Sequence, residues 1–537
     1  MMKKIVFAAL MVASLTGFSG MPTLEPAFTA AQVEKGAPKL EWTRHADGSE
    51  SVVISAKIGG PDLDGVTLIR CTAGDEKRRV VTYTLKNTTT GLRYATLGWR
   101  SVFSAVDGSD RNWFPTTDNV LDLTQHSSLW GYYTKPGPWH FALVEPWFAA
   151  YNSERRRGFA FLFDYDTLSA VYGANDMKTR GALFDGGMLP SGASIMLRTT
   201  IIALKGLGSL ATVNKDFAAG FTGPATEPSL EIQAFRDLRL SGSAVQTDVA
   251  GKRLGSATVD ATLAEGEVRQ VCSVKSEKPR TQTVLSADLS GVRFEYFREN
   301  AFRMASLPMV PPMWPHHRSL PKKTVKNSVV TEQAVEDKAL LVFGFYANFF
   351  RFEKIFPELT FKTVSAVPQG IFDVPPATTI GTYKYIFLGD VNEESVRPMI
   401  TRLASYVENG GTLVVGGGPF AYGCGGYAGT YLEKMLPVAT RSFDCLPASA
   451  QDPDGRTAVA FENCDASVFW ISKVTVKPEG RVLLRTTAGD PLLVEGAYGK
   501  GRVFAFLASP LGDESRDAKA FWNGNAAYIE TMRKLLK

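Results

Sequence analysis

Histidine and cysteine, which carry much of the nucleophilic and metal chemistry of proteins, are scarce in this sequence. Its 537 residues include five of each, and no histidine follows His317. The carboxyl-terminal part of the chain therefore lacks the residue that most often titrates near neutral pH. No CxxC pair and no HExxH motif occurs, so we expect neither a bound metal nor a cofactor.

Long apolar runs and a large charge excess are also missing. After the first residues, no run of about 18 or more apolar residues occurs, so we expect no membrane span in the mature protein. The formal net charge is only +5, and the charged residues are dispersed along the chain. A nucleic-acid partner is therefore not expected.

Residues 1–20 have the order of a secretory signal. Lys3 and Lys4 precede the apolar stretch Ile5–Phe18, and the small residues Ser19 and Gly20 follow it. This order is typical of a signal peptide, although an ordinary buried helix remains the alternative. We expect the protein to be exported, to the periplasm or the extracellular space.

The position of the signal cleavage is left open by the sequence. The pattern of small residues fits Gly17-Phe18-Ser19 and also Ala27-Phe28-Thr29, so the signal ends at about residue 20 or as late as about residue 31. No cysteine lies near either site, which disfavours a lipid anchor.

Disulfides are possible in an exported protein. The five cysteines are Cys71, Cys272, Cys424, Cys445 and Cys464. Cys445 and Cys464 share one irregular segment and are the pair we expect. The odd total leaves at least one thiol free or in an intermolecular bond.

The length predicts roughly three domains. Short alternating strands fill the amino-terminal half, and strands alternate with helices near the carboxyl terminus. The predicted fold class is multidomain β plus α/β, with a large β-sandwich, a small immunoglobulin-like β-sandwich and a flavodoxin-like parallel α/β sheet. The predicted order is a large β-sandwich (38–205), a connector with one short helix (206–228), a small β-sandwich (229–305), a proline-rich linker (306–329) and the α/β domain (330–537).

One stretch of the α/β domain has a clear β-α-β pattern. The apolar run Tyr385–Leu388 predicts a buried strand, and apolar residues spaced three and four apart from Val396 to Val407 predict a helix. Gly410 ends that helix, and Thr412–Val415 is a second buried run. Because ligands bind beyond the carboxyl ends of parallel strands, we expect any site of this domain near Gly416–Gly429.

The same region resembles a known family. The matching segments are Leu388–Asp390, Val407–Gly417, Gly426–Thr430 with Leu436–Val438, and Tyr498–Val503. Together they resemble class I glutamine amidotransferase-like domains, and most of all the putative glutamine amidotransferase branch and the trimer-forming domains of certain β-galactosidases. This resemblance implies an assembly role and a possible homo-oligomer formed through the domain.

The sequence departs from that family where catalysis would occur. Catalytic members carry a cysteine at a sharp turn after a strand and a His-Glu pair later in the chain. Here the turn reads Gly416-Gly417-Gly418, and no histidine follows. A cysteine nucleophile needs a base or an electropositive setting, so we interpret the domain as catalytically degenerate.

The large sandwich weakly resembles the galactose-mutarotase-like supersandwich of carbohydrate-active proteins. The resemblance rests on Glu145–Ala149, on Gly158–Phe161 and on the size of the domain. Such a similarity of fold does not by itself carry function.

A cluster of tryptophans suggests a sugar site in this sandwich. Five of the nine tryptophans fall between Trp99 and Trp147. Exposed aromatic faces beside carboxylates suit sugars, whereas the alternative is that these rings fill the core. The candidate substrate-binding residues are Trp113, Trp130, Trp139 and Trp147.

The same window holds candidate catalytic groups. His126 and His140 could act as acid and base. Glu145 and Asp164 could form the carboxylate pair of a glycoside hydrolase. The alternatives are structural histidines, and a salt bridge from Glu145 to an arginine at 155–157.

Three weaker candidates lie elsewhere. His316-His317 could bind a metal, but a linker is a poor place for a rigid site. Cys424 could be a nucleophile, or a structural cysteine. Gly416–Gly418 could bind an anion through backbone N–H groups, or form a tight turn that the fold requires.

Three functions follow from these observations. The leading hypothesis is an exported protein that binds or processes poly- or oligosaccharides, with a non-catalytic amidotransferase-like domain. The second is a carbohydrate-active hydrolase or lyase with its active site in the large sandwich. The third is a thiol hydrolase built on Cys424.

Overall fold

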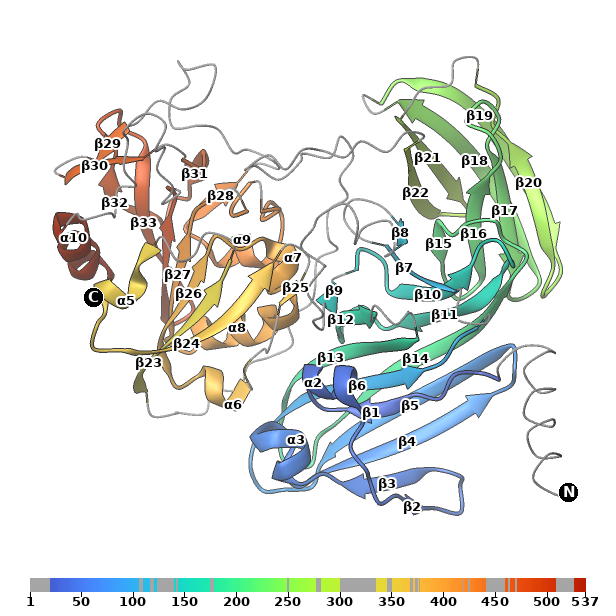
Figure 1. The fold of residues 1–537 in the computed structure, drawn as a ribbon, viewed down its shortest axis with the longest axis horizontal. Coiled ribbons are helices and arrows are strands. Elements are labelled where there is room, and N and C mark those ends of the chain that lie inside the picture. Colours follow the sequence, from blue (N-terminus) through green and yellow to red (C-terminus); the bar gives the residue numbers. More distant parts are fainter. Residues whose placement is uncertain are drawn as a thin grey trace, which may run out of the picture.

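The fold is described by a computed structural model. Two β-sandwiches lie on one side of the molecule and an α/β domain on the other (Figure 1). In the described residues, no helix combines the length and the apolar character needed to cross a bilayer. The structure describes residues 20–105, 110–115, 120–122, 140–141, 143–173, 178–248, 251–276, 282–299, 335–344, 350–367, 370–371, 375, 377–418, 420–423, 425–440, 459–461, 464–468, 471–508 and 526–537.

The large sandwich packs a five-stranded sheet against a nine-stranded sheet. Two short helices, α2 (Ala30–Lys35) and α3 (Ala56–Leu63), accompany it. The five-stranded sheet runs β1 (Glu25–Ala27), β6 (Arg93–Val102), β13 (Thr179–Leu189), β12 (Leu168–Gly173) and β9 (His140–Phe141). The nine-stranded sheet runs β2 (Thr43–Arg44), β3 (Glu50–Val53), β4 (Val66–Gly74), β5 (Arg78–Asn87), β14 (Ser194–Lys205), β11 (Arg157–Phe163), β10 (Trp147–Asn152), β7 (Arg111–Pro115) and β8 (Val120–Asp122).

The core between these two sheets is aromatic. Trp99 of β6 lies 5.3 Å from Phe161 and 6.0 Å from Phe148, measured between ring centroids. Its indole N–H donates to Thr199 Oγ1 of the opposite sheet at 3.0 Å, so the buried polar group is satisfied. The sandwich includes residues before residue 38, where the sequence predicted its start, because β1 pairs with β6.

The small sandwich consists of two four-stranded sheets with their own core. The predicted connector with a short helix is wrong in this respect: residues 206–228 contribute two strands, β15 and β16, to one of these sheets. That sheet runs β15 (Thr212–Val213), β16 (Phe217–Thr222), β17 (Ser229–Ala234) and β20 (Val268–Ser273). The other runs β19 (Arg253–Leu263), β18 (Leu238–Asp248), β21 (Gln282–Leu289) and β22 (Val292–Glu299).

The α/β domain (residues 335–537) is built on an eight-stranded sheet with parallel central strands. The sheet runs β25 (Gly370–Ile371), β24 (Thr360–Val367), β23 (Glu336–Phe343), β26 (Tyr383–Gly389), β27 (Thr412–Gly416), β34 (Gly501–Phe506), β33 (Pro491–Tyr498) and β32 (Arg481–Arg485). Two small ribbons pair β28 (Val438–Thr440) with β31 (Val474–Val476), and β29 (Val459–Phe461) with β30 (Cys464–Val468).

The predicted β-α-β stretch is confirmed in its elements. Both of its strands are almost completely buried, as continuous apolar runs require in a sheet covered on both faces. The predicted helix is divided into α7 (Glu393–Val396), a 3₁₀ turn η3 (Arg397–Met399) and α8 (Ile400–Glu408), and Gly410 follows with a φ of 109°. The other helices are α5 (Phe352–Ile355), α6 (Ala377–Ile380), α9 (Tyr431–Met435) and α10 (Ala526–Leu536).

A buried ion pair joins the two sheets of the large sandwich. Arg180 of β13 is 0% exposed and lies 2.6 Å from Asp110 Oδ2. Its Nε donates to Asn112 Oδ1 of β7 at 2.6 Å, and its guanidinium lies over the Phe103 ring. Removing one partner of such a pair leaves the other charge buried and uncompensated.

We predict that Arg180→Met destabilises the large sandwich by about 3–5 kcal/mol, because Asp110 then stays buried without its cation. Arg239→Met is the matched control: the Arg239–Asp260 pair is exposed, and its loss should cost less than about 1 kcal/mol. Urea unfolding of both variants measures the difference. Equal losses of stability would contradict this assignment.

Candidate functional site

The carboxyl ends of the parallel strands meet at Asp390, directly after β26. Asp390 is 1% exposed and has a φ of 50°, in the left-handed region that few residues other than glycine adopt. Its backbone N–H donates to the carbonyl of Gly416, the last residue of β27, at 3.3 Å. The turn after β26 is thus tied to the glycine-rich loop in which the sequence predicts a ligand site.

The carboxylate of Asp390 occupies the inner side of that loop. Its Oδ1 accepts the backbone N–H of Phe420 at 2.8 Å. Gly418 has a φ of 154°, and a Cβ added there would lie 2.1 Å from the same oxygen. The glycine is therefore required because the chain passes so close to an internal carboxylate. The sequence allowed either an anion-binding loop or a tight turn at Gly416–Gly418, and the structure has the tight turn.

Aromatic side chains fill the rest of this sheet end. Tyr422 and Tyr427 are completely buried, and their rings lie 5.4 Å apart. The Tyr422 hydroxyl donates to the carbonyl of Val415 at 2.8 Å, and the Tyr427 hydroxyl donates to that of Val391 at 2.5 Å. Burial raises the pKa of both phenols well above the usual value. The place where open α/β sheets bind ligands is thus occupied by the domain's own side chains.

The helical segment after Asp390 packs against the large sandwich. Arg397 Nε lies 2.6 Å from Glu393 Oε1, and both side chains are buried. The Arg397 guanidinium also donates to the hydroxyl of Tyr165, in the turn between β11 and β12, at 3.4 Å. Ser169 Oγ of β12 donates to the carbonyl of Pro398 at 3.0 Å. Burial raises the pKa of Tyr165 to about 12, so it is a neutral hydroxyl at physiological pH.

A second contact lies one helical turn further along, on α8. Arg402 Nε is 3.8 Å from Asp185 Oδ2 of β13, and its guanidinium lies 5.1 Å from the centre of the Tyr94 ring of β6. The guanidinium also donates to the carbonyl of Pro375 within its own domain. Burial disfavours the charged form of Arg402, but Asp185 and its other acidic neighbours outweigh this effect and raise its pKa. The ion pair therefore spans the junction of the two domains.

Further elements meet at the same junction. Helix α6 lies against α3 and β6, and β25 lies against β9. Figure 1 shows this contact where the yellow and orange helices face the blue and teal strands. Within the described parts of the chain, no group of three or more His, Cys, Asp or Glu residues is arranged to hold a metal ion.

The described tryptophans of the predicted sugar site lie in cores. Trp147 is 0% exposed and Trp113 is 7% exposed. Both belong to the apolar layer between the nine-stranded sheet and the small sandwich, together with Leu207 and Ala218. Trp99 fills the other core, between the two sheets. These three tryptophans therefore fill cores, which was the alternative interpretation. Neither Trp113 nor Trp147 has a ring face exposed for a ligand.

Glu145 and Asp164 come to the same end of the paired strands β10 and β11. The register pairs Trp147 with Leu162, and the Phe163 N–H donates to the Pro146 carbonyl at 2.8 Å. Glu145 is half-buried: its Oε2 accepts the Trp147 indole N–H at 2.9 Å and the Thr212 hydroxyl at 2.7 Å. Because Thr212 belongs to β15, this carboxylate links the two sandwiches.

Asp164 is exposed, and its carbonyl accepts the N–H groups of Thr167 and Leu168. Of the arginines at 155–157, Arg156 forms an ion pair with Glu231 at 3.3 Å, and the backbone N–H of Arg155 donates to Asn152 Oδ1.

Several predicted residues lie outside the described part of the chain. They are His126, Trp130, Trp139, His316, His317, Cys424 and Cys445. His140 is described as a backbone position of β9, opposite Tyr172, and Cys464 as one of β30. The two described thiols are free: Cys71 is exposed and Cys272 is half-buried.

Sequence reasoning missed the residues of the domain junction. Arg397 and Arg402 lie among apolar residues on the buried side of a predicted helix. This position alone indicates that each arginine has a buried partner. A charged residue on an apolar helix face needs a partner. Its partners, Tyr165 and Asp185, are too far along the chain for any local pattern to reveal.

No family model matches the chain, and no curated protein matches it. Among solved structures, cytoplasmic protein STM1381 from Salmonella typhimurium LT2 is similar over 37% of this chain and 99% of its own, with 18% identity and a TM-score of 0.30. The exo-β-1,4-mannosidase Op5Man5 from Opitutaceae bacterium strain TAV5 is similar over 38% and 35%, with 14% identity and a TM-score of 0.24.

A putative aldose 1-epimerase from Klebsiella pneumoniae is similar over 31% of this chain and 53% of its own, with 15% identity and a TM-score of 0.22. The names of these last two proteins are carbohydrate-related. Scores this low assign neither a family nor an activity to the chain.

We predict that Gly418→Ala destabilises the α/β domain by about 3 kcal/mol or more, because the added methyl group clashes with Asp390 in a left-handed backbone. Gly429→Ala is the matched control. Gly429 also has a positive φ, of 73°, but nothing lies within 4 Å of its added Cβ, so only the backbone cost of about 1 kcal/mol is expected. Thermal or urea unfolding compares the two, and equal costs would mean that the loop is open.

Proposed function

We propose that this protein is exported and binds or processes poly- or oligosaccharides through its large sandwich, while its α/β domain is a non-catalytic, docked partner. The observation that carries the second half of this proposal is the filled carboxyl end of the parallel sheet. Asp390, Tyr422 and Tyr427 are buried there and bond to the domain's own backbone. A substrate could bind at that sheet end only if these side chains moved away from it.

The amidotransferase-like, flavodoxin-like character of the α/β domain is part of this proposal. Parallel strands β24, β23, β26 and β27 in that spatial order, with helices between them, are what such a domain requires. The glycine turn after β27 carries no cysteine, and no histidine follows His317. These absences support an assembly role. A homo-oligomer formed through the domain would have to use a face other than the one that contacts the sandwich.

The sugar contacts are proposed for the end of the large sandwich where Glu145 and the turn Asp164–Asp166 lie. Two observations support this position. Asp164 and Asp166 are exposed there, and Tyr165 between them accepts a hydrogen bond from Arg397 of the adjoining α/β domain. Trp130 and Trp139 lie in the chain between β8 and β9, which belong to the two different sheets of the same sandwich. Aromatic faces from this segment would complete a sugar site.

A carbohydrate-active hydrolase or lyase is the second candidate. It is favoured by one observation, the arrival of Glu145 and Asp164 at one end of paired strands. One residue, as a protonated carboxylic acid, would protonate the leaving oxygen, and the other, as a carboxylate, would act as nucleophile or base. His126 or His140 would be alternative proton carriers. A thiol hydrolase using Cys424 ranks last, because a thiol needs an activating base and no histidine follows His317.

We predict that the protein binds a polysaccharide, and that Trp130→Ala and Trp139→Ala each weaken the binding about tenfold, because each removes a stacking surface worth roughly 1 kcal/mol or more. Affinity electrophoresis and glycan arrays measure this effect. The matched control is Trp42→Ala: Trp42 stacks on Arg70 in the same sandwich, outside the proposed site, and its removal should leave binding unchanged. Binding that both substitutions leave unaffected would sink the proposal.

The hydrolase alternative makes a separate prediction. If it is correct, Glu145→Gln and Asp164→Asn each abolish the release of reducing sugars or unsaturated products from polysaccharide mixtures, since each removes an ionisable group. Glu145→Gln keeps an acceptor oxygen for Trp147 and Thr212, so unfolding curves of the variant should stay close to wild type. Polysaccharide binding without any product release would contradict the hydrolase alternative and agree with a binding role only.

A further inference from the structure

The segment that follows the predicted signal is part of the large sandwich core. Met21, Leu24 and Phe28 are at most 8% exposed and belong to the core cluster between the two sheets. A surface extension would leave such side chains in water, whereas here they close one edge of the five-stranded sheet. The segment therefore contributes apolar surface to this core.

The backbone of this segment is also built into the sheet. Strand β1 pairs with β6 in antiparallel register, with Glu25 opposite Arg100 and Ala27 opposite Gly98. The sheet lies close beneath the segment at two glycines. A Cβ on Gly98 would make a tight contact of 3.1 Å with the Ala27 carbonyl oxygen, and one on Gly181 would lie 2.4 Å from Cγ1 of Val33 in α2, too close to fit without a shift. Strand β1 and helix α2 are thus both packed directly on the sheet.

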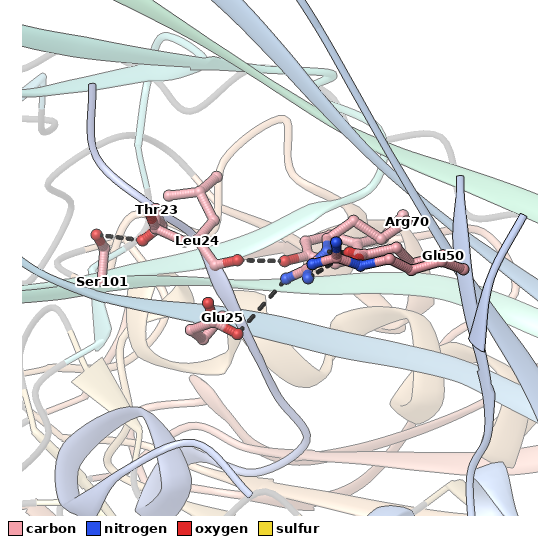
Figure 2. Close-up of polar contacts among 8 residues, drawn as sticks. Thr23, Leu24, Glu25, Glu50, Arg70 and Ser101 are labelled. Carbon is pink, nitrogen blue, oxygen red and sulfur yellow. Dashed lines mark hydrogen bonds and ion pairs between the residues drawn. The ribbon is translucent and has the colours of Figure 1, made fainter. Parts of the chain in front are cut away.

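Side chains from three different strands make polar contacts with Thr23, Leu24 and Glu25 of this segment (Figure 2). The Tyr83 hydroxyl of β5 donates to the Leu24 carbonyl at 2.6 Å, and Ser101 Oγ of β6 donates to the Thr23 carbonyl at 2.6 Å. Arg70 of β4 lies 3.5 Å from the carboxylate of Glu25. The Tyr83 bond is buried, so removing its acceptor would leave a polar group unsatisfied inside the sandwich.

The structure therefore discriminates between the two cleavage sites that the sequence allows. A cut after Thr29 would remove β1, three core side chains and the Leu24 and Thr23 carbonyls. It would also remove the cap of α2, because Thr29 Oγ1 accepts the Gln32 N–H. The new ammonium group at Ala30 would then lie at the positive end of that helix. A cut before Met21 leaves all of these contacts intact.

We propose that export cleavage hydrolyses the Ser19–Gly20 peptide bond and that the mature protein keeps residues 21–35 as a structural strand and helix. A leader-removing endopeptidase of the exporting cell catalyses this reaction. One water from the solvent is consumed, and the products carry a carboxyl group on Ser19 and an amino group on Gly20. The inference rests on the export that forms part of the proposed function.

The test is to express the full chain in an exporting bacterial host and to determine the amino terminus by intact mass and Edman sequencing. We expect a terminus at Gly20, loss of processing in Ser19→Leu, and unchanged processing in Thr29→Val, which blocks only the later site and keeps the side-chain shape. A terminus at Ala30 overturns this inference and leaves export intact. An uncut chain retained in the cytoplasm overturns export as well.

A second measurement does not depend on export. Chains starting at Gly20 and at Ala30, each behind an initiating Met, are produced in the cytoplasm and melted. We expect the shorter chain to melt lower by roughly 10 °C or more, or to be recovered as aggregate, because it lacks β1 and its core residues. Equal melting temperatures would overturn the structural role of the segment.

Discussion

Arg402 and Asp185 form an ion pair between the α/β domain and the large sandwich, and both side chains are almost completely buried. Such a pair adds little net stability, because removing two charges from water costs several kcal/mol per ion. Its effect is on geometry. A shift of the domains by a few ångströms would separate two buried charges, so the ion pair favours one arrangement of the domains. The hydrogen bond from Arg397 to Tyr165 also crosses the junction, and the pair with Glu393 within the same helical segment holds the Arg397 side chain in place.

This constraint connects the buried sheet end of the α/β domain with its contact to the large sandwich. The segment that carries Arg397 and Arg402 begins three residues after Asp390, which closes the glycine loop from inside. The closed sheet end and the docked helices are therefore one continuous piece of the chain. In the proposed function, a domain fixed in this way borders the proposed site at Glu145 and Asp164 without taking part in chemistry. Among the described residues, Asp390, Tyr422 and Tyr427 occupy its own sheet end.

Much of the fold follows from local pattern. The run Tyr385–Leu388, the apolar spacing from Val396 to Val407 and the glycine after it correctly predicted a strand, a helix and a left-handed stop, because burial and backbone sterics act within a few residues. The segment 206–228 was mispredicted because its strands β15 and β16 are short and gain stability from β17 and from the face of the nine-stranded sheet. No property of the segment alone reveals that partner.

The candidate site was less predictable than the fold, for the same reason. Trp147 and Trp113 had the composition of a sugar platform, but composition does not distinguish an outer face from a layer between two sandwiches. Glu145 was named as a candidate from its neighbours in the sequence, whereas its bond to Thr212 depends on how the second sandwich docks. The contact of Asp390 with Gly418 joins the ends of two strands, β26 and β27, so neither segment reveals it alone.

The central claim is that the α/β domain is closed at its sheet end and held against the sandwich. Hydrogen–deuterium exchange, resolved by peptide, tests it most directly. We expect the amides of residues 390–402 and 422–427 to exchange as slowly as those of β26, and Arg402→Met to speed exchange at residues 164–169 and 397–402 while leaving β18 and β21 of the small sandwich unchanged. Rapid exchange of residues 390–402 and 422–427 in the wild-type protein would contradict the account.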